Sequence, residues 1–284
     1  MSHRIAIIGP GLLGASIALA ARRSGGARVA VWARRAEIVE EVRAREIADT
    51  VSSDLGEVIA EADTVVLCVP IGAMPALARE IVTRIPPRAL ITDVGSVKAG
   101  VVSELSAIFR ERGRFIGSHP MAGSDKAGHE HASAELFDGR VCIVTPDAAT
   151  PPDALADATA FWKMLGCSVR TLAPAEHDEV VALISHLPHL LAATLVNTVA
   201  TRNPAAFDFH GPGFFDTTRV AAGQPELWAE ILRANSAAVR AAAEAMIEML
   251  REITTLLDSE KPMKEFLNEA KIQRDRLRPA KTDV

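Results

Sequence analysis

The amino-acid sequence predicts an α/β fold with a doubly wound, mainly parallel sheet, followed by an all-α C-terminal domain. Two observations carry this prediction. Short apolar runs rich in β-branched residues alternate with stretches of helical length, which is the pattern of βαβ units. After about Ala173 the strand-like runs stop and only helical spacing continues. The length of 284 residues suits two domains, which we place at residues 1–173 and 174–284.

The elements of the first domain are expected in a regular order. A strand at 5–8 leads through a glycine-rich turn into a helix at 12–23. Because right-handed crossovers join parallel strands, ligands are expected outside the carboxyl ends of the strands. Further strands are predicted at 29–32, 64–69, 90–92, 115–117, 141–144 and 168–172, and helices at 36–45, 73–83 and 98–110.

The second domain is predicted to consist of long helices. Residues 174–202 form one helix, kinked at Pro188 because proline has no backbone N–H to donate. Residues 225–257 form another, and 261–276 form a solvated final helix with a frayed end after Pro279. An alanine-rich stripe on the 225–257 helix is either packed core or a dimer interface, which periodicity does not distinguish. We predict a homodimer through these C-terminal helices. The stripe comprises Ile231, Asn235, Ala238, Ala242, Met246, Met249, Ile253 and Leu256.

Composition and charge narrow the classes of function. The chain is 49% hydrophobic and 24% charged, as expected of a folded protein. A net charge of −5 without a Lys/Arg block argues against nucleic acid as the partner, but not against a small anionic substrate. The N-terminal apolar run resembles a secretory signal but is interrupted at residues 9–11, and no later run is expected to span a membrane. We expect a cytoplasmic protein in which Cys68, Cys142 and Cys167 are buried, reduced thiols.

A GxGxxG motif occupies the turn between the first strand and the first helix. Glycines at this position let the backbone approach a pyrophosphate, and the N-terminus of the helix favours its negative charge. The motif therefore predicts a Rossmann-type dinucleotide site rather than a tight turn without a ligand. The residues expected to bind the cofactor are Gly9, Gly11, Leu12, Leu13 and Gly14.

The end of the second strand should decide between NAD and NADP. An NAD site usually has Asp or Glu there, whereas this chain has Arg34 and Arg35. Two guanidinium groups suit a 2′-phosphate, so we predict NADP as the cofactor. NAD stays possible if the arginines only begin a surface helix and Glu37 or Glu40 holds the ribose.

Two candidate catalytic residues follow neighbouring strands at the carboxyl edge of the sheet. Ser96 follows the strand at 90–92 and could be a helix N-cap, or it could meet a substrate hydroxyl. His119 leaves the next strand at the same edge. A histidine beside a nicotinamide can take a hydroxyl proton while hydride leaves the same carbon, which indicates a dehydrogenase.

A second histidine cluster lies 67 residues after His119, at His186 and His189. Their spacing of three places them on one helix face, where a metal site is the competing interpretation. No third ligand stands at a useful spacing, and the run from His129 to His131 is interpreted as a mobile polar loop. We therefore expect no metal.

Four motifs together resemble the prephenate and arogenate dehydrogenases of tyrosine biosynthesis, in the same order and at similar spacing. They are Gly95–Lys98, His119–Ser124, Ser185–His189 and Phe215–Ala221, and the resemblance extends from Arg4 to about Arg276. It implies NADP- or NAD-dependent oxidative decarboxylation of prephenate to 4-hydroxyphenylpyruvate. An arogenate or dual-specificity cyclohexadienyl dehydrogenase is the alternative.

The resemblance also implies roles for single residues. His119 would accept the hydrogen bond of the ring hydroxyl, and Ser96 would hold that hydroxyl or orient the histidine. His186 would lie beside the nicotinamide with His189 nearby, while Arg219, His189 and Ser118 would bind the substrate. Because His119 must be neutral, activity should rise as the pH passes the usual histidine pKa of about 6.5. Since no regulatory segment follows Val284 in this sequence, any inhibition by tyrosine is expected at or near the active site.

Two further classes stay open from the residues alone. A β-hydroxyacid dehydrogenase would share the two-domain build but leave both histidine clusters without a purpose. A non-catalytic nucleotide sensor would bind the cofactor without turnover, which the presence of His119 and Arg219 argues against.

Overall fold

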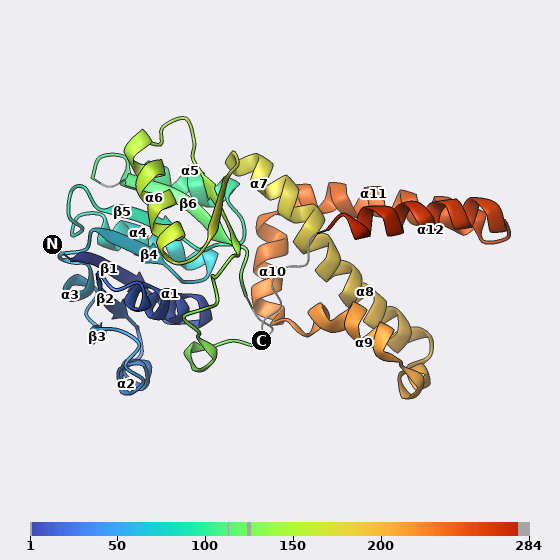
Figure 1. Cartoon of the computed structure of the whole chain (residues 1–284), viewed down its shortest axis with the longest axis horizontal. Coiled ribbons are helices and arrows are strands. Elements are labelled where there is room, and N and C mark those ends of the chain that lie inside the picture. Colours follow the sequence, from blue (N-terminus) through green and yellow to red (C-terminus); the bar gives the residue numbers. More distant parts are fainter. Residues whose placement is uncertain (1, 113, 124–125, 278–284) are drawn as a thin grey trace.

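The computed structural model describes residues 2–112, 114–123 and 126–277, which form an α/β part and a helical part. The α/β part forms one end of the molecule, and the later helices extend away from it (Figure 1). The chain passes between them after strand β8 (Ser168–Thr171), where helix α7 (Pro174–Val181) begins. The predicted fold class is thereby confirmed. Two expectations, for Ser124 and for the segment after Pro279, fall outside the described residues.

Within the described residues, eight strands form one sheet in the order β3-β2-β1-β4-β5-β6-β7-β8. Neighbouring strands are parallel except β6 and β7, which are antiparallel. The strand order reverses between β1 and β4, and doubly wound sheets bind their ligands at such a reversal. The strands are β1 (His3–Ile8), β2 (Ala27–Trp32), β3 (Thr50–Ser52), β4 (Thr64–Leu67), β5 (Leu90–Asp93), β6 (Arg114–Pro120), β7 (Val141–Thr145) and β8.

Two strands differ from the prediction. Strand β3 was not predicted, because three residues at the edge of a sheet give too short a run for alternation to show. Strand β6 continues to Pro120 instead of ending near Gly117, since its last residues pair with the antiparallel β7. His119 therefore lies within the end of a strand, opposite Ile143, and its backbone is held by the sheet.

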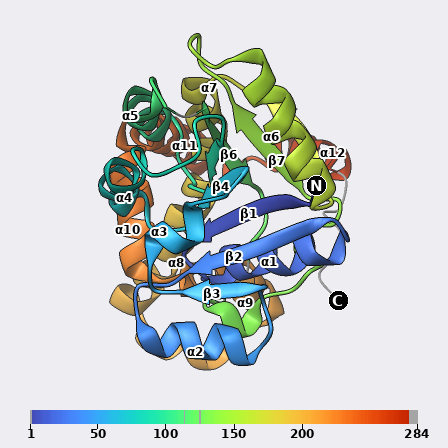
Figure 2. The same ribbon diagram turned by 90° about the vertical axis from the view of Figure 1, so that its left-hand side faces the viewer.

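Helices cover both faces of the sheet, each over its own apolar core. One core contains buried residues of α1, α2 and α6, and the other contains those of α3, α4 and α5. Figure 2 shows α4 and α5 on one side of the strands and α6 on the other. Ile231, from the helical part, joins the second core and so fixes the two parts to each other. The helices are α1 (Leu12–Arg23), α2 (Ala36–Ala44), α3 (Leu55–Ile59), α4 (Met74–Ile81), α5 (Ala99–Phe109) and α6 (Pro152–Met164).

The predicted helix at 174–202 is continuous but contains a π turn. After α7, residues Ala182–His186 (η3) form the π turn, and α8 (Leu187–Arg202) follows with Pro188 in its first turn. Pro188 lacks the N–H that would bond one turn back, and the wider turn accommodates this loss directly before it. The predicted kink is thus a π turn that places His186 at its end.

The predicted helix at 225–257 is in fact two helices. Helix α10 (Pro225–Ala234) ends at Asn235, and α11 (Ser236–Leu256) begins after it. Asn235 is buried and its side chain bonds to groups outside its own helix, which holds the backbone out of helical geometry at that point. The predicted final helix is present as α12 (Glu260–Asp275).

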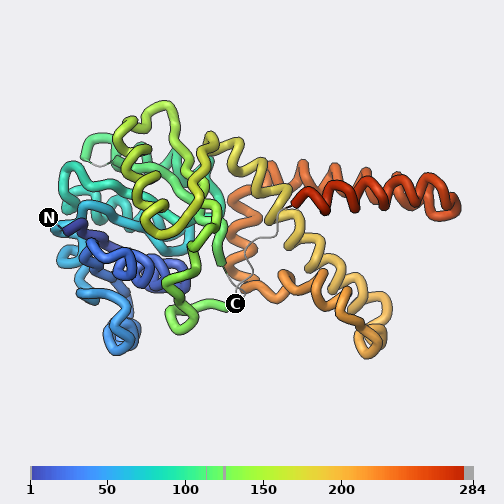
Figure 3. The backbone as a smooth tube through the Cα atoms, in the orientation of Figure 1, coloured from blue at the N-terminus to red at the C-terminus, as the bar shows by residue number. Residues whose placement is uncertain are grey.

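The helical part extends from the α/β part in two arms. Figure 3 shows the chain running outward along α8 and returning through α9 (Pro212–Thr218) to α10. It then runs out again along α11 and turns back as α12. The run Gly211–Phe215 forms the N-cap and the first turn of α9.

The membrane and cysteine expectations need two corrections. The stretch Pro174–Arg202 passes the length and composition test for a membrane-spanning helix, with a mean hydropathy of 1.6 over its most apolar window. Core helices of soluble proteins pass the same test, so the finding does not decide between them. Cys142 and Cys167 are free and buried as expected, but Cys68 is only half-buried, because it lies at the edge of a cavity.

Candidate active site

A cavity of about 660 Å³ lies at the carboxyl ends of β1, β4 and β5, where the helical part meets the sheet. Its walls come from the GxGxxG turn, the segment after β5, the end of β6, the π turn and the segment from Arg219 to Ile231. The first four of these five segments were each identified from the sequence, and the fold brings them together. Among the lining residues are Gly11, Leu12, Leu13, Gly14, Gly95, Ser96, His119, Ser185, His186, Arg219 and Trp228.

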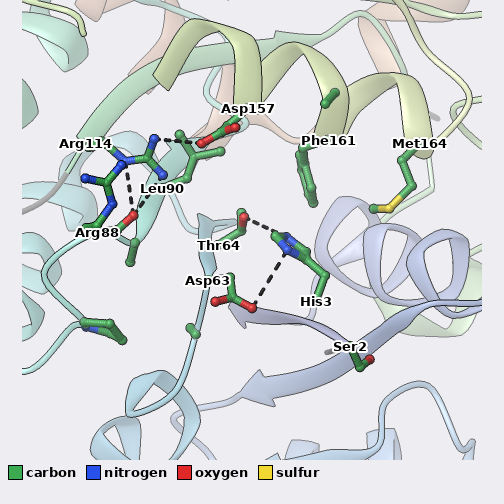
Figure 4. A pocket seen from close by; sticks show the side chains of 14 residues that line it. Ser2, His3, Asp63, Thr64, Arg88, Leu90, Arg114, Asp157, Phe161 and Met164 are labelled. Carbon is green, nitrogen blue, oxygen red and sulfur yellow. Dashed lines mark hydrogen bonds and ion pairs between the residues drawn. The ribbon is translucent and has the colours of Figure 1, made fainter. Parts of the chain in front are cut away.

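A second cavity, of about 730 Å³, lies at the opposite end of the strands (Figure 4). Its polar side chains satisfy one another. His3 Nε2 is 3.0 Å from the Thr64 hydroxyl, and Arg114 donates to Asp157 at 2.7 Å. Ligands of doubly wound sheets bind at the carboxyl ends of the strands, so we do not place the chemistry in this cavity.

The GxGxxG turn has the geometry that a dinucleotide requires. Gly9 has φ +104°, and a Cβ there would lie 2.6 Å from the carbonyl oxygen of Cys68. A Cβ on Gly14 would collide with the carbonyl oxygen of Gly9, so both positions need glycine for close packing. Gly11 is the N-cap of α1 and faces open space, with no capping side chain. The first N–H groups of α1 are therefore available to an anionic ligand, and these residues fit a bound pyrophosphate.

Arg34 and Arg35 follow β2 and are exposed. Neither makes an ion pair with the described residues, and neither lines the cavity itself. Glu40 is paired with Arg43 at 2.5 Å, so of the two acids considered for the ribose, Glu40 is already engaged.

His119 is 9% exposed and lines the cavity from the end of β6. Its Nδ1 is 2.9 Å from Nε2 of His177, whose own Nδ1 is 2.8 Å from Asp178 Oδ1. Burial lowers the pKa of His119 well below its usual value, and the neighbouring basic groups His177, Lys98 and His186 lower it further. The ring is therefore neutral near pH 7 and can accept a proton.

Lys98 and Asp93 form a fully buried ion pair beneath His119. Asp93 also accepts the backbone N–H of Gly95 at 2.8 Å and of Ser118 at 3.1 Å. These bonds tie the segment after β5 to β6. Ser118 is fully buried, with its hydroxyl 2.7 Å from that of Thr92, and it is absent from the cavity lining.

Ser96 is half-buried and lines the cavity, but it is not a helix cap. Helix α5 begins three residues later, at Ala99, and its first N–H groups are accepted by a side chain from another helix. Asp178 of α7 accepts Lys98 N at 2.7 Å and Ala99 N at 2.9 Å. The N-cap expectation for Ser96 is thus wrong, and the Ser96 hydroxyl is not needed for capping.

His186 and His189 differ in their surroundings. His186 lines the cavity at the end of the π turn, and its Nδ1 is 3.1 Å from Asn235 Nδ2. Burial lowers its pKa to about 4, and its buried Nε2 has no partner among the described residues. His189 lies outside the lining and stacks on Trp228, with ring centroids 3.6 Å apart.

Arg219 lines the cavity at the start of a short 3₁₀ turn, η5 (Arg219–Ala222), directly after α9. It is exposed and makes no ion pair with the described residues. A free guanidinium at a cavity wall can bind a carboxylate with two parallel hydrogen bonds.

Several residues of the site were missed by sequence reasoning, namely Lys98, His177, Asp178, Trp228 and Asn235. Asn235 carried a usable signal, because it is a polar residue on an otherwise apolar stripe. His177 and Asp178 gave none, since they stand in a polar run typical of a solvated helix and meet their partners only through the fold.

The segment His129–His131 (η2) was interpreted as a mobile polar loop, and this was partly wrong. It is a 3₁₀ turn in which His129 is buried and lies 3.3 Å from Glu41. No group of three or more His, Cys, Asp or Glu that could hold a metal ion occurs in the part of the chain that the structure describes. The absence of a metal stays a prediction.

Comparison with known proteins shows the family to which the chain is related. Two family models match, the prephenate dehydrogenase nucleotide-binding domain over residues 17–171 and the prephenate dehydrogenase dimerization domain over 173–270. Cyclohexadienyl dehydrogenase of Zymomonas mobilis is 34% identical over 262 residues, which cover 90% of this chain and 89% of that one. Prephenate dehydrogenase of Bacillus subtilis is 33% identical, covering 92% of this chain and 71% of that one.

Solved structures give the same result. Prephenate dehydrogenase from Aquifex aeolicus, in complex with hydroxyphenyl propionate and NAD⁺, superposes with a TM-score of 0.90 at 30% identity and covers 96% of this chain and 98% of that one. Arogenate dehydrogenase of Synechocystis superposes with a TM-score of 0.84 at 30% identity, covering 96% of this chain and 99% of that one. A 3-hydroxyisobutyrate dehydrogenase from Salmonella typhimurium, at 13% identity and a TM-score of 0.60, shares the fold alone. The resemblance drawn from the four motifs is confirmed, and the chain belongs to the prephenate dehydrogenase family, whose members are nicotinamide-dependent oxidoreductases.

Proposed function

We propose that this chain oxidises and decarboxylates prephenate to 4-hydroxyphenylpyruvate. The observation that carries the proposal is the position of His119, a buried and neutral base in the same cavity as the open GxGxxG turn. Its relatives are dehydrogenases of this kind, and the cavity joins the groups that such a reaction needs. Arg219, a free cation at the cavity wall, suits a substrate with two carboxylates.

The residues of the chain would divide the reaction among them. His119 accepts the proton of the ring hydroxyl, and the half-buried Ser96 hydrogen-bonds the same oxygen and fixes its direction. Arg219 pairs with a carboxylate, and His186 lies at the wall of the same cavity, where it would contact a bound molecule. A nicotinamide dinucleotide held by the first turn of α1 supplies the acceptor for the hydride. The C–H bond of the ring carbon that bears the hydroxyl breaks as its hydride leaves. The carbon–carbon bond to the ring carboxylate breaks, its electron pair completes the aromatic ring, and carbon dioxide leaves. His119 then returns its proton to the ring oxygen, which gives the hydroxyl group of 4-hydroxyphenylpyruvate.

The protein contributes mainly orientation and charge placement, because formation of the aromatic ring favours the overall reaction. His119 is held from behind by His177 and its backbone by the sheet, so its ring cannot turn freely. Trp228 forms an apolar wall beside His186, with ring centroids 6.3 Å apart, and helps to exclude water.

NADP is the proposed cofactor. Arg34 and Arg35 are exposed after β2 and unpaired among the described residues, so they are available for a 2′-phosphate. Replacing both by alanine should raise the KM for NADP at least about tenfold, the effect of losing one charge-assisted hydrogen bond, and leave the KM for NAD within about twofold. If the wild type instead prefers NAD, the proposed preference for NADP is wrong, and Glu37 becomes the candidate ribose ligand.

We further propose a homodimer that buries apolar side chains of the helical part. Ile247, Leu250 and Leu257 near the end of α11 are 46%, 50% and 68% exposed, and Leu267 of α12 is 57% exposed. Several exposed large apolar side chains on two neighbouring helices favour a protein interface. Light scattering should give twice the 30.3 kDa chain mass, and Leu250→Glu should lower it. A monomer at micromolar concentration would contradict the proposal.

The choice between prephenate and arogenate needs a direct assay. Steady-state rates with each substrate, each with NAD and with NADP, report substrate, cofactor and catalysis together. The proposal expects the highest kcat/KM with prephenate and NADP. A preference for arogenate would make the chain an arogenate dehydrogenase, and cofactor binding without turnover on either substrate would make it a nucleotide sensor.

A further inference from the structure

We propose that Asp178 and His177 are positioning residues that fix the ring tautomer of His119, so that its Nε2 is the proton-accepting nitrogen. This inference rests on the proposed function, because it assigns the catalytic direction of the same base. It starts from a chain of buried hydrogen bonds that connects α7 to β6 and ends at the cavity.

The first link is the carboxylate of Asp178. Its Oδ1 accepts Lys98 N at 2.7 Å and faces His177 Nδ1 at 2.8 Å, while its Oδ2 accepts Ala99 N at 2.9 Å. Burial raises the pKa of Asp178, but the hydrogen bonds from His177 and from both backbone N–H groups outweigh it and leave the pKa lowered. An ionised carboxylate only accepts hydrogen bonds, so Nδ1 of His177 carries a proton.

The second link follows from the count of protons on an imidazole. The proposal requires a neutral His177; such a ring has one N–H, so a proton on Nδ1 leaves a lone pair at Nε2. That atom lies 2.9 Å from Nδ1 of His119. For the contact to be a hydrogen bond, His119 must donate from Nδ1, which leaves the lone pair of the neutral His119 ring on Nε2.

The third link is the consequence for proton transfer. His119 has no other hydrogen-bond partner in the described part of the chain, and its ring lines the cavity. Nε2 is therefore the nitrogen left for the hydroxyl of a substrate. Once Nε2 takes that proton, the charged ring keeps its bond to His177, which is held in turn by the carboxylate of Asp178. In serine proteases, neutralising the acid that holds the catalytic histidine leaves this histidine in the wrong tautomer, and the resulting loss of rate is large.

The backbone carbonyl of Asp178 also helps to fix the tautomer of His186, which is opposite to that of His119. Asn235 Nδ2 donates to the carbonyl oxygen of Asp178 at 2.8 Å, and its other hydrogen points to His186 Nδ1 at 3.1 Å. Nδ1 of His186 is therefore an acceptor, and its proton lies on the buried Nε2 that has no partner among the described residues. The two histidines that line the cavity are thus fixed in opposite tautomers.

Three variants separate this positioning role from a merely structural one. Asp178→Asn removes the charge that favours a proton on His177 Nδ1 and leaves the backbone N–H of Lys98 or Ala99 without an acceptor, so kcat should fall by about 10³-fold. His177→Phe removes the acceptor and should lower kcat by about 10²-fold. His177→Gln places an amide oxygen near the lost Nε2 and should restore at least a tenth of the wild-type kcat. None of the three should change the KM for prephenate by more than about threefold, because neither residue lines the cavity.

Asp147→Asn is the matched control. Asp147 is a half-buried carboxylate that also accepts a backbone N–H, from Ala149 at 2.9 Å, but it lies away from the cavity. This variant should keep the wild-type kcat. Thermal unfolding and cofactor affinity, measured for every variant, identify any loss that comes from misfolding.

The deciding measurement is ¹⁵N NMR of the protein labelled at histidine, with His119 assigned by comparison with His119→Asn. We expect His119 protonated at Nδ1 and His186 protonated at Nε2 in the wild type. A wild-type His119 protonated at Nε2, or folded His177→Phe with kcat within threefold of wild type, overturns the inference. If His119→Asn itself keeps its rate, the proposed function fails instead, and the tautomers can still be determined because the spectra do not depend on turnover.

Discussion

The neutral, buried His186 should make the folded protein sensitive to mild acid. Burial lowers the pKa of His186 from 6.5 to about 4, and the neighbouring His177 and His189 act in the same direction, while Asp178 opposes them. In the unfolded chain the ring takes up a proton below its usual pKa of about 6.5. In the folded protein the ring takes up a proton only as the pH approaches 4. The stability contributed by the neutral ring is therefore complete above pH 6.5 and is lost as the pH falls from there through about 4.

The magnitude follows from the size of the shift. A pKa difference of about 2.5 units corresponds to roughly 3 kcal/mol, since each unit is worth about 1.4 kcal/mol. At pH 4.5 most of this, about 2.5 kcal/mol, should already be lost. In His186→Asn an amide oxygen can still accept from Asn235, but the side chain does not titrate.

Urea unfolding of the wild type and of His186→Asn at pH 7.5, 6, 5 and 4.5 measures this contribution. The difference in the free energy of unfolding between the two proteins should change by about 2 to 3 kcal/mol in favour of the variant between pH 7.5 and pH 4.5. Because all other titrating groups are common to both proteins, they largely cancel in this difference. A difference that stays constant over this pH range would refute the assignment of a buried, neutral His186.

Three further predictions address the cofactor turn, the substrate carboxylate and the pH dependence of catalysis. Gly11→Ala should weaken dinucleotide binding, measured by titration, with little change in Tm, since its Cβ meets only open space. Gly14→Ala should also lower the free energy of unfolding by about 1–3 kcal/mol, because its Cβ collides with Gly9. Equal effects of the two variants on Tm would contradict this expectation. Arg219→Ala should lower kcat/KM for prephenate about 10- to 100-fold, the cost of a lost bond to a charged group, and an unchanged value would exclude it as the carboxylate ligand. The fall of kcat/KM at low pH should lie below pH 6.5, because burial and then the basic groups around His119 lower the pKa of its ring. A fall that begins above pH 7 would contradict a neutral buried base.

The sequence predicted those parts of the fold that depend on local periodicity. Alternating apolar runs and the glycine-rich turn were sufficient for the order of βαβ units, because each signal lies within a few residues. Strand β3 (Thr50–Ser52) was too short to show alternation. The end of β6 was misplaced because its last residues are held by pairing with β7, which follows more than 20 residues later.

The break at Asn235 shows where periodicity misleads. Residues on both sides of Asn235 keep helical spacing on one stripe, so the pattern alone predicts one helix. The helix ends there because Asn235 bonds to the carbonyl of Asp178 and to His186, which are 57 and 49 residues away in the chain. Contacts of this kind are tertiary, and a pattern within one helix does not contain them.

The candidate site was predictable where a residue type itself carries the chemistry. His119, Gly11 and Gly14 were identified on that basis, Arg219 was identified from the resemblance of its motif, and all four line one cavity. The residues behind them were not, since the roles of His177 and Asp178 exist only through contacts 58 to 80 residues distant in the chain. The pH expectation changes for the same reason, because the sequence supplies the ordinary pKa of histidine and only the fold supplies its surroundings.

The most direct test of the account is the turnover rate of His119→Asn with prephenate and NADP. An asparagine at this position fills most of the space of the ring but does not accept a proton, so kcat should fall by about 10²- to 10⁴-fold while the Kd for the dinucleotide stays within about threefold. A folded variant that binds the dinucleotide and turns over at close to the wild-type rate would show that another group removes the hydroxyl proton.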